Sequence, residues 1–155
     1  MLITEEIFRA FLRCETKSFL LRKGSIGDHH MFTAWQDRSL EAYRQNCLMQ
    51  LRGHYPSQAC LLGPSSMQQI LEYPYQFVFD CLIQADNLQV HLDALERLPE
   101  PDKVHYSYIP VRFIPHEKVT KYDKLLLAFD ALVLELASGK RLRHGRIIHG
   151  RNHKA

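Results

Sequence analysis

The fold is decided by residues 77–98, FVFDCLIQADNLQVHLDALERL. Apolar and aromatic side chains dominate residues 77–83, which favours a buried strand. The dipeptide Asp86-Asn87 then supplies a turn. Over residues 88–94 apolar and polar side chains alternate with the period of two that a half-buried strand requires. This stretch predicts a β-hairpin and is the clearest strand signal in the chain.

Helical patterns precede the hairpin. Thr4, followed by two acids, is typical of a capped helix start, and apolar side chains recur at helical spacing from there to Leu20. Gly24 and Gly27 are expected to end this helix. The expected helices before the hairpin are residues 4–20, 31–52 and 67–72.

A third strand, a long helix and a last short strand are expected after the hairpin. The third strand covers residues 104–114, where Pro110 favours an edge or an irregular position because it has no N–H to give to a ladder. The helix begins at Thr120 and is apolar nearly all round up to Gly139, which predicts burial. Residues 146–149 read as a strand. The order α-β-β-β-α-β predicts an α+β fold with a small mixed sheet and extra amino-terminal helices.

The composition bounds the class of protein. The chain has 155 residues, of which 46% are hydrophobic and 24% charged, as in a single globular domain rather than a disordered tail or a fibre. No acid follows Glu135, while residues 139–155 hold six Lys or Arg side chains. Such a segment is a candidate contact for a phosphate backbone, and a solvated basic end is the alternative. No Gly-rich phosphate loop or H-E-x-x-H signature is present, which argues against nucleotide hydrolases and metalloproteases.

The cysteines and the first residues of the chain indicate the cellular compartment of the protein. Cys14, Cys47, Cys60 and Cys81 are far apart and form no C-x-x-C pair, so neither a disulfide framework nor a self-contained zinc site is predicted. We expect reduced thiols, most of them buried. The first residues carry acids where a signal peptide carries Lys or Arg, and no apolar run approaches the roughly 18 residues of a membrane helix. We therefore expect a soluble, cytoplasmic protein with no membrane partner.

Several phrases spread over nearly the whole chain resemble one family. They include HLDALER (91–97), YIPVRF (108–113), DKLLLAFD (123–130) and IIHG (147–150), together with parts of residues 2–17 and 34–44. They are similar to the amino-terminal region of RecB-like nucleases, which are often fused to helicase-type regions. The expected order of elements also resembles the core of the PD-(D/E)XK nuclease superfamily. The resemblance implies one nuclease-type domain over residues 1–155, and because relatives continue beyond this end, it leaves open whether the chain is a fragment.

The resemblance implies a metal site at the hairpin. In such nucleases an acid on the second strand and an acid-x-Lys motif on the third bind Mg²⁺ or Mn²⁺, which activates a water molecule. Asp93 stands at the position of the second-strand acid, on the same face as His91. From spacing alone, the alternative is a solvent-side residue that pairs with a nearby Arg. Asp80 is the candidate second metal ligand and Glu96 the candidate second catalytic acid, with Glu117 as a further candidate.

The third strand departs from the pattern of active enzymes. Pro110 stands where the resemblance places an acid, and Arg112 stands where it places the catalytic Lys. Arg112 is a poor substitute, because the pKa of a guanidinium stays above about 12. A Gln-x-x-x-Tyr motif on the next helix is replaced by Leu126 and Asp130. The sequence therefore predicts a domain with degraded catalytic motifs, which if active is a metal-dependent DNA nuclease that uses Asp93 and Arg112.

Cys14 matches a cysteine of a different kind of site. Some relatives hold a [4Fe-4S] cluster with one cysteine near the amino terminus and three near the carboxyl terminus. The three later cysteines are missing here, so we expect no cluster in this chain and regard Cys14 as a remnant. The alternative for Cys14 is a buried helix cysteine.

The basic end and the long helix suggest two kinds of partner. The expected contacts with a DNA backbone are Arg141, Arg143, Arg146, Arg151 and Lys154. The rival interpretation is a non-catalytic domain that packs against a helicase-type partner or against a missing carboxyl-terminal region. If the long helix exposes an apolar face, self-association is expected.

Overall fold

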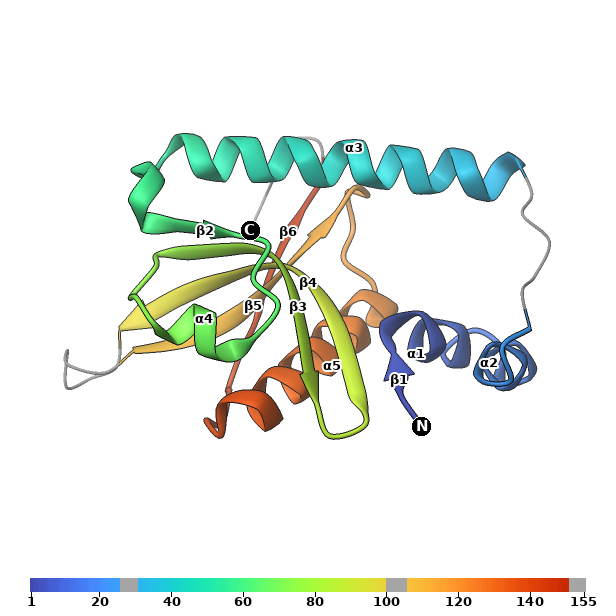
Figure 1. Cartoon of the computed structure of the whole chain (residues 1–155). Helices are drawn as coiled ribbons and strands as arrows, with labels where there is room; N and C mark the ends of the chain where they lie inside the picture. Colours follow the sequence, from blue (N-terminus) through green and yellow to red (C-terminus); the bar gives the residue numbers. More distant parts are fainter. Residues whose placement is uncertain (26–30, 100–105, 151–155) are drawn as a thin grey trace.

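The fold consists of one mixed β-sheet with helices on both faces (Figure 1). The structure, a computed structural model, describes residues 1–25, 31–99 and 106–150. Its helices are α1 (Glu5–Phe11), α2 (Glu15–Arg22), α3 (Met31–Gly53), α4 (Met67–Leu71) and α5 (Lys121–Ser138), with a 3₁₀ turn at Ser57–Ala59. Its strands are β1 (Ile3–Thr4), β2 (Cys60–Leu62), β3 (Phe77–Ala85), β4 (Leu88–Pro99), β5 (Tyr106–Ile114) and β6 (Arg146–His149). The predicted α+β class and the predicted order of the main elements are confirmed.

The sheet has one strand that changes partner along its length. The strand order is β2-β3-β4-β5-β6, and β1 lies beside β4. β3 and β4 form the predicted antiparallel hairpin, and β5 pairs with the other edge of β4. Leu88 and Gln89 of β4 pair with β1, whereas Ala94 to Pro99 pair with β5. β4 and β5 therefore separate just before Ala94, and we call this point the fork.

Two apolar cores lie on opposite sides of the sheet. Figure 1 shows α3 crossing one face and α5 crossing the other. Strand β3 contributes to both cores, since Phe79 packs with the α3 side and Cys81 with the α5 side. Residues two apart in a regular strand face the same way. Asp80, which lies between them, has a φ of +57°, and this left-handed residue breaks the alternation.

The first predicted helix is wrong as a continuous element. The structure divides it into α1 and α2, because Cys14 is in an extended conformation with φ −161° and ψ 111°. Cys14 is exposed, so its interpretation as a buried helix cysteine is also wrong. Of the four cysteines, Cys47 and Cys81 are buried. The short strands β1 and β2 were not predicted, since two or three residues carry no readable period.

The third strand and the long helix lie where predicted, but their surroundings differ. Pro110 pairs with Leu95 in an interior strand, not at an edge, and β6 begins to pair only at the next residue, Val111. α5 is buried on one side only, because one face suffices to cover the sheet. Its exposed leucines are Leu125, Leu132 and Leu136. Among the described helices, none is both long and apolar enough to cross a membrane.

The amino terminus of α5 carries the capping box that the sequence predicts. The backbone N–H of Asp123 donates to the hydroxyl of Thr120 at 3.3 Å, and the backbone N–H of Thr120 donates to the carboxylate of Asp123 at 2.8 Å. Nε2 of His116 lies 2.9 Å from the same carboxylate. Burial acts to raise the pKa of Asp123, but these hydrogen bonds outweigh it and hold the pKa below its ordinary value.

Replacing Asp123 with asparagine is expected to lower the free energy of unfolding by about 1 kcal/mol at neutral pH. Because the pKa of Asp123 is depressed in the folded state, its contribution is present above the unfolded pKa of about 3.9 and is lost as the pH falls through the folded pKa. Urea unfolding of both proteins from neutral pH to about pH 3 checks this, and the difference between the two should begin to shrink below about pH 4. Asp37→Asn, an exposed acid on α3, is the control; an equal loss there contradicts the capping role.

Candidate functional site

Asp93 lies buried at the fork between β4 and β5, with 4% of its side chain exposed. One carboxylate oxygen accepts the backbone N–H of Phe113 at 2.8 Å, and the other lies 2.7 Å from Nε of Arg44 on α3. Burial raises the pKa of Asp93, while Arg44 and Arg112 act to lower it. The alternative of a partner arginine is therefore confirmed, but its solvent-side position is wrong. The carboxylate lies inside the fold because it accepts the backbone N–H of Phe113 in β5. At this point β4 no longer pairs with β5, so the N–H has no partner on the β4 backbone.

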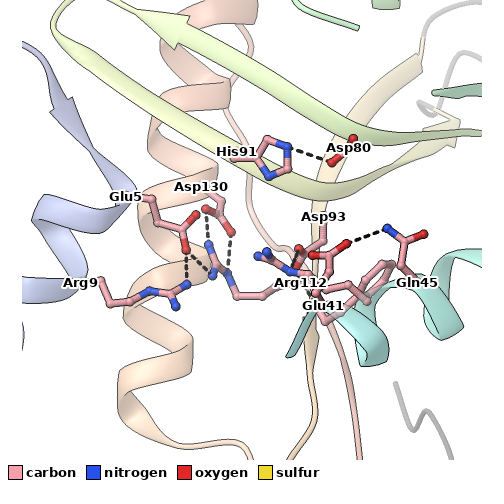
Figure 2. A network of polar contacts seen from close by, with 11 residues as sticks. Glu5, Arg9, Glu41, Gln45, Asp80, His91, Asp93, Arg112 and Asp130 are labelled. Carbon is pink, nitrogen blue, oxygen red and sulfur yellow. Dashed lines mark hydrogen bonds and ion pairs between the residues drawn. The ribbon is translucent and has the colours of Figure 1, made fainter. Parts of the chain in front are cut away.

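Arg112 of β5 is held between two carboxylates on the α5 side of the sheet (Figure 2). It is 5% exposed. Its Nε and Nη2 donate to the two oxygens of Asp130 on α5 at 2.8 and 2.6 Å, which is a bidentate pair. Its Nη1 donates to Glu5 of α1 at 2.8 Å, and Glu5 also accepts from Arg9. Arg112 therefore ties α1 and α5 to the sheet.

These contacts form two neighbouring groups of ion pairs, one around Arg112 and one between Asp93 and Arg44, which together we call the Arg112 network. Its three carboxylates and three guanidiniums are Glu5, Asp93, Asp130, Arg9, Arg44 and Arg112. Burial raises the pKa of Asp130 against the pull of Arg112. Burial also acts to raise the pKa of Glu5, but Arg112 and Arg9 outweigh it, so the pKa of Glu5 lies below its ordinary value. The network thus leaves no excess of carboxylate charge to attract a divalent cation.

The other predicted acids lie outside the Arg112 network. Asp80 is 58% exposed and lies 2.9 Å from Nε2 of His91. Glu96 pairs with Arg146 at 2.7 Å, and Glu117 is exposed. Across the three described stretches of chain, no group of three or more His, Cys, Asp or Glu side chains converges as metal ligands. Because Mg²⁺ takes several oxygen ligands, this arrangement does not fit the metal site that the resemblance implies, and metal binding stays a prediction.

A pocket of about 350 Å³ opens beside the Arg112 network. It is lined by Thr4, Glu5, Glu6, Arg9, Arg44, Leu82, Gln89 and His91. The size is within the range of ligand sites. Of its charged lining groups, Glu5 and Arg9 are paired with each other and Arg44 is paired with Asp93, while Glu6 is an exposed acid.

The predicted DNA contacts are described only in part. Arg141 and Arg143 are exposed in the segment that joins α5 to β6, and Arg146 is in its ion pair with Glu96. Arg151 and Lys154 lie outside the described residues. Figure 1 shows that this segment leaves α5 at the end that lies away from α1 and α2. The structure therefore does not bring Arg141 and Arg143 to the pocket.

Sequence reasoning missed the roles of Glu5, Arg9 and Arg44 in this site. A signal for Arg44 was available, because it shares the helical stripe of Cys47, Leu48 and Leu51, which pack in the α3 core. A charged residue inside an apolar stripe indicates a buried ion pair. Glu5 and Arg9 gave no such signal, since acids in a first helical turn and an i, i+4 pair are ordinary surface features.

No protein-family model matches the chain, and no curated protein matches it. The RecB-like assignment therefore rests on the sequence resemblance and stays a prediction.

Proposed function

We propose that this chain is a cytoplasmic, RecB-like nuclease-type domain that binds DNA without cutting it. The observation that carries the proposal is the pairing of Arg112 with Asp130. The resemblance assigns these two positions to the catalytic Lys and to the Tyr of the following helix. Here they bind each other through two hydrogen bonds of 2.8 and 2.6 Å. Both side chains are thus committed to joining α5 to the sheet.

Phosphodiester hydrolysis would need groups that the Arg112 network does not leave free. A catalytic Lys orients the attacking water with an N–H, whereas three of the five N–H groups of Arg112 donate to Glu5 or Asp130 and the side chain is only 5% exposed. Arg112 cannot exchange a proton either, because its neighbours raise its already high pKa despite burial. Both oxygens of Asp93 already accept contacts from Phe113 and Arg44. Because Arg112 and Asp93 are already paired in this way, the site favours a role in binding over a role in catalysis.

An assay on labelled single- and double-stranded DNA with Mn²⁺ and Mg²⁺ tests the proposal. We expect no metal-dependent cutting above background, the same background in Asp93→Asn and in the exposed control Asp37→Asn, and DNA binding that weakens with salt. Cutting that requires Mn²⁺ and disappears only in Asp93→Asn would overturn the proposal, because it would mean that Asp93 holds a metal. Absence of any DNA binding would overturn it as well.

The second candidate is a protein-interaction domain, which one observation favours. Leu125, Leu132 and Leu136 on the outer side of α5 are 38%, 46% and 47% exposed. Exposed leucines on one helix are typical of a surface that another chain covers. The same DNA assay separates the two candidates, because a protein-interaction domain would bind neither form of DNA.

A further inference from the structure

The two short helices at the amino terminus expose large aromatic side chains. Phe11 at the end of α1 is 52% exposed, and Phe19 in α2 is 55% exposed. Neither ring belongs to either apolar core. The pair of helices, residues 5–23, therefore carries two rings whose position packing does not explain.

This helical pair is fixed to the body of the domain. The ring of Phe8 stacks on Phe129 of α5 with centroids 4.5 Å apart, and Glu5 pairs with Arg112. Within the pair, the hydroxyl of Ser18 donates to a backbone oxygen of α1 at 3.2 Å. The helical pair is thus held firmly, and it lies away from the end of α5 at which the segment with Arg141 and Arg143 begins (Figure 1).

The helical pair carries more cations than acids at its exposed positions. The exposed cations of the helical pair are Arg13, Lys17, Arg22 and Lys23, and its exposed acids are Glu6 and Glu15. Nζ of Lys23 lies 5.7 Å from the centroid of the Phe19 ring. The ammonium group therefore lies over one face of a ring that is 55% exposed, and a base would stack on the other face.

We propose that this helical pair is a binding surface for single-stranded DNA, an inference that rests on the DNA-binding function proposed above. Unpaired bases stack on exposed aromatic rings, and the phosphates next to them pair with cations. In a duplex the faces of the bases are covered by their neighbours, so Phe19 would have nothing to contact. A protein partner that covered Phe19 would also have to desolvate Lys23, which is costly unless it brings a matching acid.

Fluorescence anisotropy with a labelled oligothymidine and with a blunt duplex tests the surface in the full chain. We expect Phe19→Ala to weaken single-strand binding about fivefold or more, and Phe19→Tyr to keep it, because stacking needs a ring. The double variant Lys17→Ala/Lys23→Ala should flatten the slope of log affinity against log salt by roughly 0.7 for each phosphate that it no longer neutralises. Arg38→Ala/Arg52→Ala, which removes the same charge from exposed positions on α3, is the matched control, and Arg141→Ala/Arg143→Ala tests the DNA contacts that the sequence predicts.

The outcomes separate this inference from the proposed function. Single-strand binding that survives Phe19→Ala, or that is abolished only in Arg141→Ala/Arg143→Ala, overturns the helical pair as the surface while DNA binding itself stands. No binding of either DNA overturns both. A Phe19→Ala variant that keeps its DNA affinity but no longer self-associates would show that the ring serves a protein contact. Since Phe19 is more than half exposed, thermal unfolding of the variants should match that of the wild type.

Discussion

Replacing Arg112 with methionine is expected to destabilise the domain by about 3–5 kcal/mol, the cost of breaking a buried ion pair by removing one partner. The side chain is 5% exposed and forms three hydrogen bonds with Glu5 and Asp130. Without the guanidinium, these two carboxylates face one another in the interior with no cation between them. A typical domain is stable by only about 5–15 kcal/mol, so much of the chain should be unfolded in mild denaturant. Urea unfolding followed by circular dichroism measures the loss.

Two further variants decide whether charge is the cause. Arg112→Met/Asp130→Leu removes both partners of the bidentate pair and should recover much of the stability, because an apolar pair of similar volume is often as stable as a buried ion pair. Arg146→Met breaks a pair whose arginine is 40% exposed and should cost no more than about 1 kcal/mol. A double variant as unstable as Arg112→Met would contradict the electrostatic explanation and point to poorer packing instead.

The pH dependence of Arg112→Met gives an independent check. Burial raises the pKa of Asp130 in the folded state, and removal of Arg112 takes away the charge that opposes this rise. The folded variant therefore binds a proton that the unfolded chain releases above about pH 4. Its stability should increase as the pH falls from neutral to about pH 5, and a flat profile over that range would contradict buried, ionised Asp130 as the source of the loss.

The elements that the sequence predicted well are those fixed by local chemistry. The hairpin over residues 77–98 follows from its strand period and its Asp86-Asn87 turn, and both neighbours of the turn pair as expected. The long helix begins at Thr120 with its capping box and ends at Gly139 with a φ of +68°, as a glycine cap requires. Each of these signals lies within a few residues of the structure it specifies, so one sequence is enough to find it.

The parts that escaped prediction depend on residues far apart in the chain. Glu5 and Arg112 are separated by 107 positions, and nothing near either residue indicates the other. The fork exists because β1 takes over one edge of β4, and a strand of two residues has no period of its own. The resemblance singled out Asp93 as a metal ligand and its spacing suggested a solvent-side residue, whereas its burial follows from this fork. The sequence thus pointed to Asp93 and Arg112 one by one, but not to the ion pairs that they form.

Replacing Phe129 with alanine is expected to cost about 3–5 kcal/mol and to release the helical pair from the rest of the domain. Phe129 is 6% exposed in the α5 core, and its ring stacks on Phe8 of α1. Removing the ring leaves a cavity and takes away an apolar attachment, while the Glu5–Arg112 pair, the pairing of β1 with β4 and the contact of Arg13 with Tyr122 remain. Trypsin should therefore cleave within residues 9–23, which contain five Lys or Arg side chains, much faster than in the wild type.

Leu132→Ala on the same helix is the matched control, because Leu132 is 46% exposed and its truncation creates no cavity. It should change the free energy of unfolding by less than about 1 kcal/mol and leave the tryptic rate unchanged. If Phe129→Ala loses stability but residues 9–23 stay protected, the remaining contacts, among them the ion pair to Arg112, are sufficient to dock α1, and the stack on Phe8 is only core packing. If stability and protection decrease together, the surface proposed for single-stranded DNA depends on the same apolar contact that completes the α5 core.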